Sequence, residues 1–459
     1  MSLRQIIFRL ALELGARTHC LLPVVKVLEG AIVQVLPKAG TRMAKTPIRI
    51  LALNPDRFRG DLEVVANSGE VCVYRFPFVW QSRFLAAYFS EDVSLSEHAN
   101  PAVGSRTWRA KRNFSRVLVP IFRQLAKRQR FDVVVGAAVH YLQDMHLGAA
   151  ANQAGLPYVV FHRENFMASP SLLEGAMTRL TEMGRFGGSQ IIVHNDHARE
   201  AFVQSGFVAP EQCRALGALR MGQFLDQLEQ PQMKPKGERP LVVFFSFTHG
   251  VGQIGHRIHW SDISGRRGFV RLFDSVYVAL ATLAARRPDI DIVVKPKWGG
   301  DFVQRIEAAL LRSNIDRSTL PNLRIDTAIG AQHLIMNADV VSAFNSTTML
   351  EAAVAGKPVV VPLFDEAAQE DHADLISLKG ELSAVFDTAR SAADYLDLIE
   401  QRLLHWSPSV ELMERRKALF DEWVAPLGRK ASEQYIHALE LARDRGSPSA
   451  TPGSNQRAG

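Results

Sequence analysis

Three hydroxyl-bearing residues, Ser346, Thr347 and Thr348, separate a predicted buried strand over 339–344 from a predicted helix over 347–355. The start of a helix offers free backbone amides and the positive end of the helix dipole, and both attract anions. One capping residue would satisfy the helix. The surplus of hydroxyl donors therefore predicts that this turn binds a phosphate group.

A purely structural interpretation of the same turn stays open. Thr348 and Glu351 have the spacing of a capping box, in which a threonine and a glutamate three residues later bond the backbone at the helix start. In that interpretation Glu351 bonds back to the turn and contacts no ligand.

A glycine-containing loop is a second candidate phosphate site. It follows the predicted strand LVVFFSF (241–247) and contains Gly250 and Gly252, which let the backbone approach a ligand closely because they lack side chains. The glycines are followed by a long polar stretch instead of a helix, so a flexible surface loop is the alternative.

The most reactive side chains of the first half stand where predicted strands end. His162, Arg163 and Glu164 follow one strand, and His140 ends its neighbour. Transfer of a group to a hydroxyl needs a base, for which Glu164 and His162 are the candidates. Arg163 would hold an anionic acceptor or a departing phosphate, and His140 would share the pocket. The alternative is an Arg–Glu surface pair beside structural histidines.

Neither a metal nor another cofactor is expected. No DxD triplet follows a predicted strand in a suitable place, and a helix dipole with lysines can neutralise a leaving diphosphate without a cation. The absence of a GxxxxGK[ST] loop disfavours ATP-driven chemistry. Three cysteines, Cys20, Cys72 and Cys213, lie far apart without zinc spacing, which indicates a reduced cytosolic compartment.

Short apolar runs alternate with helical patterns along most of the chain, which predicts parallel sheets covered by helices. The fold class is therefore α/β, with two doubly wound, Rossmann-like domains that face a cleft. Ligands of such sheets bind beyond the carboxyl ends of the strands, where the candidate residues stand. The predicted order is an amphipathic basic segment over 1–45, an acceptor domain over 46–226, a linker over 227–240, a nucleotide-donor domain over 241–444 and a disordered tail over 445–459.

The charge of the chain favours an anionic partner, because its 459 residues carry a formal net charge of +7. Apolar residues near the start repeat at helical spacing with arginines between them. This segment is too interrupted for a signal peptide or a membrane span, and a basic amphipathic helix on the inner face of the cell membrane is the hypothesis. An ordinary helix docked on its domain is the alternative.

The stretch ADVVSAFNSTTMLEAAVAGKPVVVP resembles the donor-site segment of GT-B glycosyltransferases, most closely the bacterial capsule and surface-polysaccharide branch. The resemblance extends over roughly residues 130–365. It implies that Ser346, Thr347 and Thr348 contact the donor diphosphate and that Glu351 contacts a donor hydroxyl. DIVVKPKWGG is similar to a family strand that ends in a basic residue, which implies Lys295 and Lys297 near the phosphates.

The leading hypothesis is a glycosyltransferase that moves a sugar from a nucleotide-sugar donor to a surface-polysaccharide or glycolipid acceptor, without nucleic acid as a partner. A CDP-linked glycerophosphotransferase is one alternative. A sugar-nucleotide 2-epimerase would need several acid and base residues around the sugar, which do not assemble here. A non-catalytic protein of the same fold that binds a glycan or lipid also stays open.

Overall fold

The computed structural model describes residues 2–230, 239–251, 267–297 and 300–446. The chain divides into two compact units. The first unit comprises Met1–Asn165, Met177–Gln223 and Leu427–Gly459, and the second comprises Phe166–Ala176 and Phe224–Pro426. None of the helices in the described ranges has the length and hydrophobicity that a membrane span requires.

The first unit is built on a seven-stranded sheet with the order β1-β3-β2-β4-β5-β6-β7. All pairs are parallel except β1 with β3. The central strands are short, fully buried apolar runs, as expected for a parallel sheet covered on both faces. The strands are β1 (Val33–Val35), β2 (Ile48–Ala52), β3 (Val71–Arg75), β4 (Val133–Gly136), β5 (Tyr158–Phe161), β6 (Gln190–Val193) and β7 (Cys213–Ala215).

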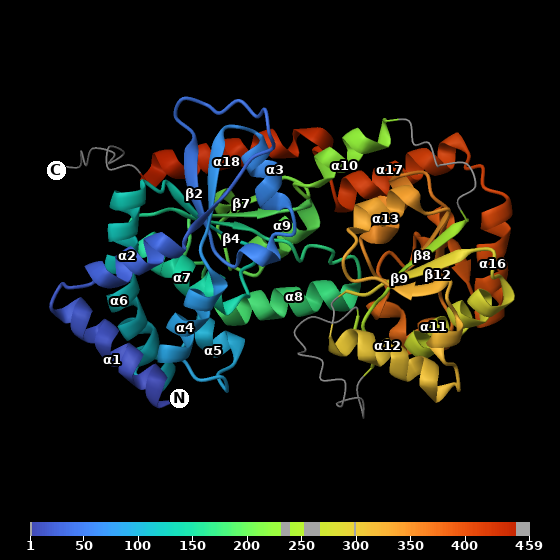
Figure 1. Ribbon diagram of the computed structural model, residues 1–459, viewed down its shortest axis with the longest axis horizontal. Coiled ribbons are helices and arrows are strands. Elements are labelled where there is room, and N and C mark those ends of the chain that lie inside the picture. The colour runs from blue at the N-terminus through green and yellow to red at the C-terminus, as the bar shows by residue number, and fades with distance from the viewer. Residues whose placement is uncertain (1, 231–238, 252–266, 298–299, 447–459) are drawn as a thin grey trace, which may run out of the picture. The chain divides into compact units, whose positions relative to one another are not determined.

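Helices cover both faces of this sheet (Figure 1). Helices α3 and α18 share one hydrophobic core with alternate residues of the strands, and α7 packs on β4 and β5 from the other side. The helices of the first unit are α1 (Leu3–Arg17), α2 (Leu22–Ala31), α3 (Asp61–Asn67), α4 (Phe78–Tyr88), α5 (Leu95–Ala99), α6 (Arg106–Gln129), α7 (Leu142–Gln153), α9 (Asp196–Gln204) and α18 (Ala431–Gly446). Helices α8 (Pro170–Met183) and α10 (Met221–Leu228) pass from one unit to the other.

The second unit contains a six-stranded parallel sheet with the order β10-β9-β8-β11-β12-β13. In chain order this is 3-2-1-4-5-6, the strand order of a Rossmann fold, and the order reverses between β8 and β11. The strands are β8 (Leu241–Phe245), β9 (Asp291–Lys295), β10 (Leu323–Ile325), β11 (Val340–Ala343), β12 (Val359–Pro362) and β13 (Asp387–Ala389).

Two helix layers cover the second sheet. Helices α11 and α16 pack against each other and on the strands, as do α13 and α14, while α17 packs on α14. The helices of this unit are α11 (Val270–Arg286), α12 (Asp301–Arg312), α13 (Ala331–Asn337), α14 (Thr348–Val354), α15 (Leu382–Val385), α16 (Ala392–Leu404) and α17 (Val410–Trp423).

These two sheets confirm the predicted α/β class with two doubly wound, Rossmann-like domains. The predicted cleft between them stays a prediction. One strand end differs from the expectation, because β4 stops at Gly136 and not at His140. The Asp144 carboxylate accepts hydrogen bonds from the amides of Ala137 (2.6 Å) and Ala138 (3.1 Å), which turns the chain away from the sheet.

The boundaries of the units also differ from the predicted domains. The donor domain was expected to continue to residue 444, yet residues from Leu427 onward belong to the first unit. The cause is α18, whose apolar residues Tyr435, Ile436 and Leu439 enter the core of the first sheet. The expected linker over 227–240 overlaps the end of α10, and its residues 231–238 lie outside the described part.

The expected segment over 1–45 contains two helices and β1, and α1 packs on α4 and α6. Strand β1 was not predicted from the sequence, because it is only three residues long and two of them are exposed. The expected tail over 445–459 begins inside the last turn of α18, and its residues 447–459 lie outside the described part.

Candidate functional site

Three histidines gather at the carboxyl edge of the first sheet. His162 directly follows β5, His194 directly follows β6, and His140 stands four residues after β4. The rings of His140 and His162 lie 5.7 Å apart, centroid to centroid. Burial lowers the pKa of His194, and the nearby charges of Arg220, Arg163 and His162 lower it further. The structure therefore brings together His140 and His162, which were predicted, and His194, which was not.

His162 is the more buried of the two predicted bases, with 3% of its surface exposed. Burial, together with the nearby charge of His140, lowers the pKa of His162 to about 3, so the ring is neutral near pH 7. Its Nδ1 atom has no hydrogen-bond partner among the described residues. A buried polar atom without a partner costs about 1–3 kcal/mol, which a hydrogen bond to a ligand would recover.

Glu164 is exposed and lies close to both rings. Its negative charge raises the pKa of His140 and of His162 against the lowering effect of burial. A hydrogen bond with the Glu164 backbone also raises the pKa of His162. An exposed carboxylate next to two neutral imidazoles is suited to accept a proton from an incoming hydroxyl.

Arg163 forms a buried ion pair with Asp61, with 2.9 Å between Nη1 and Oδ2. Burial raises the pKa of Asp61, while the charges of Arg163 and Arg220 lower it. Arg163 thus has a protein partner, and its predicted role in holding an anion stays a prediction. Asp61 was missed because nothing in the sequence around it marks a partner for a residue 102 positions later.

The surroundings of this edge are rich in cations. Arg57 and Arg59 are exposed where the chain leaves β2, and Arg57 lies 5.1 Å above the ring of Tyr141. Arg163 and Arg220 are near Asp61, and the carboxylates of Asp144 and Glu164 are near Arg57. The edge therefore carries charges of both signs.

The neutral state of His162 predicts acid-sensitive folding. An unfolded histidine takes up a proton below about pH 6.5, whereas the folded one does so near pH 3. Unfolding therefore consumes a proton between these values, and stability falls as the pH falls, by up to about 1.4 kcal/mol per pH unit. Urea unfolding at pH 7, 6, 5 and 4 should show a shallower loss in His162→Gln than in the unaltered chain. Parallel profiles would contradict the buried neutral state.

In the second unit, the predicted phosphate turn lies where the strand order reverses. The turn follows β11, and the loop with Gly250 follows the neighbouring β8. In open parallel sheets this switch point is where ligands bind. The helix that follows, α14, is short, with seven residues, so the position in the sheet is the stronger argument.

The hydroxyl groups of the turn are partly engaged with each other. Thr348 donates from Oγ1 to Oγ of Ser346 (2.9 Å), and its amide donates to the same oxygen (3.3 Å). Thr347 donates from Oγ1 to Oε1 of Glu351 (3.1 Å). Within the described ranges, the hydroxyl proton of Ser346 has no acceptor and is available to a ligand.

Glu351 is buried, with 1% of its surface exposed, and both carboxylate oxygens have protein donors. Gln332 donates from Nε2 to Oε2 (2.7 Å), opposite the bond from Thr347. Glu351 thus bonds back to the turn, as the structural interpretation expected, but through Thr347 and not through Thr348. Its predicted contact with a donor hydroxyl stays a prediction.

Gly250 is buried after β8, whereas Gly252 lies outside the described residues. The loop closes at its base, where the Phe269 amide donates to the His249 carbonyl (2.6 Å). The backbone amides at the start of the next helix, α11, already have a protein acceptor. Glu366 accepts hydrogen bonds from the amides of Arg271 and Leu272, both at 2.8 Å.

The two predicted lysines occupy different environments. Lys295 is the last residue of β9 and donates from Nζ to the Thr327 carbonyl (2.7 Å), in the loop that follows β10. Lys297 is exposed two residues later. Neither position tests the predicted contact with phosphate.

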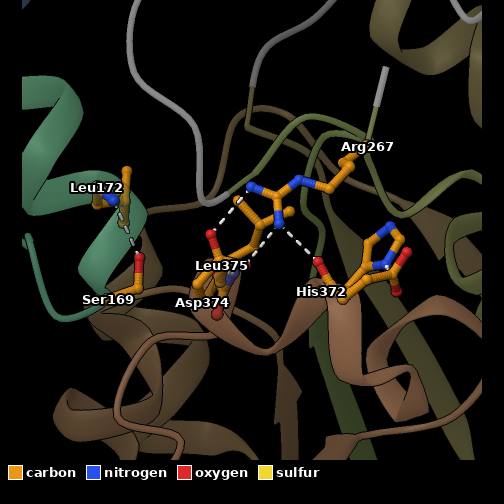
Figure 2. A network of polar contacts seen from close by, with 8 residues as sticks. Ser169, Leu172, Arg267, His372, Asp374 and Leu375 are labelled. Atoms are coloured by element: carbon orange, nitrogen blue, oxygen red, sulfur yellow. Dashed lines mark hydrogen bonds and ion pairs between the residues drawn. The ribbon is translucent and has the colours of Figure 1, made fainter. Parts of the chain in front are cut away.

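Arg267 binds the segment next to the turn that contains Asp371 and Asp374 (Figure 2). Its guanidinium donates to both carboxylate oxygens of Asp374 (2.7 and 2.9 Å) and to the Asp371 carbonyl (2.6 Å). The same segment holds Asn345, which donates to the Leu375 carbonyl (2.7 Å) and accepts from the Ser377 amide (2.8 Å). These bonds position the turn from the side opposite β8. Asn345 was not among the predicted site residues. Its backbone has a left-handed φ of 49°, which asparagine tolerates better than most residues.

Across the residues that the structure describes, no group of three His, Cys, Asp or Glu side chains is arranged to hold a metal ion. The expected independence from metals and other cofactors stays a prediction.

No protein-family model and no curated protein matches this chain. Several solved structures resemble it in fold. A UDP-GlcNAc 2-epimerase from Neisseria meningitidis bound to UDP-GlcNAc is 12% identical with a TM-score of 0.46, and the match covers 86% of this chain and 100% of that chain. An α,α-trehalose 6-phosphate synthase from Burkholderia multivorans is 12% identical with a TM-score of 0.48, covering 90% of this chain and 100% of that chain.

The wall teichoic acid polymerase TagF in a complex with CDPG is 11% identical with a TM-score of 0.41, covering 69% of this chain and 73% of that chain. At identities and TM-scores this low, the similar structures carry no argument about activity. The two doubly wound sheets of this chain match the GT-B type of fold that the resemblance implied.

Proposed function

We propose that the chain is a glycosyltransferase that moves a sugar from a nucleotide-sugar donor to a surface-polysaccharide or glycolipid acceptor. The observation that carries the proposal is the position of Ser346, Thr347 and Thr348 at the switch point of a sheet with Rossmann strand order. The donor diphosphate would bind there, next to the buried Gly250. The Ser346 hydroxyl, which accepts from Thr348, would donate its proton to a phosphate oxygen.

The acceptor would bind at the carboxyl edge of the first sheet. Glu164 would take the proton of the acceptor hydroxyl, and the oxygen would attack the anomeric carbon as the bond to the diphosphate breaks. His162 would orient the acceptor through its unpaired Nδ1, and His140 would line the same pocket. The exposed Arg57 and Arg59 support an acceptor that carries phosphate or carboxylate groups.

The test is a thermal-shift titration against CMP, CDP, UDP, GDP, TDP and ADP. We expect one nucleotide to stabilise the chain, by about 2.7 kcal/mol when its concentration is 100 times Kd. Ser346→Ala should weaken that nucleotide about 10- to 100-fold, because a hydrogen bond to a charged group contributes about 1.5–3 kcal/mol.

Ser383→Ala is the matched control, because Ser383 is an exposed serine on α15 of the same unit. It should leave nucleotide binding unchanged. A preference for cytidine nucleotides that extends to CDP-glycerol would favour the glycerophosphotransferase alternative. No shift with any nucleotide would favour a non-catalytic binding protein and would contradict the proposal.

A further inference from the structure

Helix α1 exposes a row of large apolar side chains. Leu3, Ile7, Leu10 and Leu14 recur at helical spacing and are between 55% and 72% exposed. The inner face of the helix is separately satisfied, because Phe8 packs against the rings of Trp80 and Phe84. The outer row is therefore not needed for the fold of the first unit.

Helix α2 extends this apolar surface with Leu22 and Val27, which are 44% and 52% exposed. Exposed cations accompany it, with Arg4 and Arg17 near the ends of α1 and Lys26 on α2. Single exposed leucines are common on protein surfaces, but a continuous apolar row bordered by charges indicates an interaction site.

Helix α6 next to them is strongly basic. Its 24 residues include eight lysines and arginines and no aspartate or glutamate. A groove of about 560 Å³ runs along this helix and is lined by Trp108, Arg112, Arg116 and Arg123 among others. The Arg112 guanidinium lies 5.5 Å from the centre of the Trp108 ring, which holds it at the groove. Arg116 has no partner among the described residues.

The apolar and basic surfaces belong to one packed assembly. Both α1 and α2 pack directly on α6, and the three helices lie at the same end of the first unit (Figure 1). Glu29 of α2 also pairs with Arg128 of α6, with 2.5 Å between Oε1 and Nε. The exposed residues of α1 and α2 and the basic residues of α6 therefore belong to neighbouring helices of one unit.

We propose that the first unit docks on an anionic lipid bilayer through this surface, with α1 and α2 in contact with the acyl boundary and the α6 groove in contact with lipid phosphates. A soluble polyanion would leave the apolar row in water, and an apolar protein partner would leave the arginines unpaired. A bilayer with anionic headgroups offers both kinds of contact side by side. The proposal deepens the membrane-associated acceptor of the proposed function, but lipid binding is measured without turnover, so each can fail separately.

The test is co-sedimentation of the full chain with vesicles of phosphatidylcholine, with and without phosphatidylglycerol. We expect binding to the anionic vesicles and weak binding to phosphatidylcholine alone. Ile7→Ser/Leu10→Ser should lower partitioning about tenfold or more, because two exposed apolar side chains lose their contact with lipid. Arg112→Glu/Arg116→Glu should have a comparable effect through the lost attraction to phosphate.

Matched controls lie in the second unit. Leu311→Ser/Leu404→Ser replaces two leucines that are 65% and 69% exposed, and Arg324→Glu/Arg390→Glu makes the same change in net charge at exposed positions. Both should bind vesicles as the unaltered chain does. Equal weakening by the two arginine pairs would mean general adsorption of a chain with net charge +7 and would overturn the proposal.

A second overturning result concerns the apolar row itself. If Ile7→Ser/Leu10→Ser left vesicle binding unchanged but altered the sedimentation coefficient of the free protein, a second copy of the chain would be what covers α1. All four variants change exposed side chains, and circular dichroism should confirm that each of them is folded.

Discussion

Replacing Glu164 with glutamine should lower kcat about 10²- to 10⁴-fold, the usual contribution of a positioned general base. The amide keeps the size of the side chain but cannot take a proton. Because Glu164 is exposed, the substitution should not affect folding. The donor residues belong to the other unit, so the affinity for the nucleotide should stay the same. Initial rates at saturating donor and acceptor, paired with nucleotide titration, measure both quantities.

Glu200→Gln is the matched control, because Glu200 is an exposed glutamate on α9 of the same unit. Its kcat should equal that of the unaltered chain. Full activity in Glu164→Gln would contradict Glu164 as the base and would leave His162, the other predicted base, to be tested in the same way.

Replacing Asp61 with alanine should lower the free energy of unfolding by about 3–5 kcal/mol. The ion pair between Asp61 and Arg163 is nearly enclosed, with side chains 5% and 11% exposed, so the substitution strands a buried guanidinium. Urea unfolding at pH 7, followed by circular dichroism, measures the change.

Two further variants make this experiment decisive. Glu63→Ala removes a carboxylate from the same helix α3, but its pair with Arg75 is exposed, so we expect a cost of only about 0–1 kcal/mol. Asp61→Leu/Arg163→Met should recover much of the lost stability, because apolar side chains can replace a buried pair without stranding a charge. If Asp61→Ala and Glu63→Ala cost the same, the buried pair does not stabilise this unit.

Much of the candidate site was accessible from the sequence because strand ends are a local property. Apolar runs such as YVVF and QIIV end in polar residues, and parallel strands bring their carboxyl ends to one edge. This reasoning placed His140, His162 and Glu164 together, and the structure agrees with that grouping. It could also have found His194, since β6 ends in a histidine in the same way as β5.

The partners of these side chains were not accessible in this way. Asp61 meets Arg163, Gln332 meets Glu351, and Glu366 caps α11 from a loop nearly a hundred residues later. Each pairing depends on how segments distant in sequence pack against each other, and no spacing rule encodes it. The sequence therefore suggested that the start of α14 binds an anion, whereas the structure shows that some of its hydroxyl groups are already engaged.

By itself, the sequence determined the fold class, because that follows from patterns a few residues long. Tertiary structure alone decided where α18 belongs. Its sequence continues from the second unit, yet Tyr435 and Leu439 complete the core of the first sheet. Burial of an apolar helix face is favourable wherever a matching face is open, and only the assembled strands show which face that is.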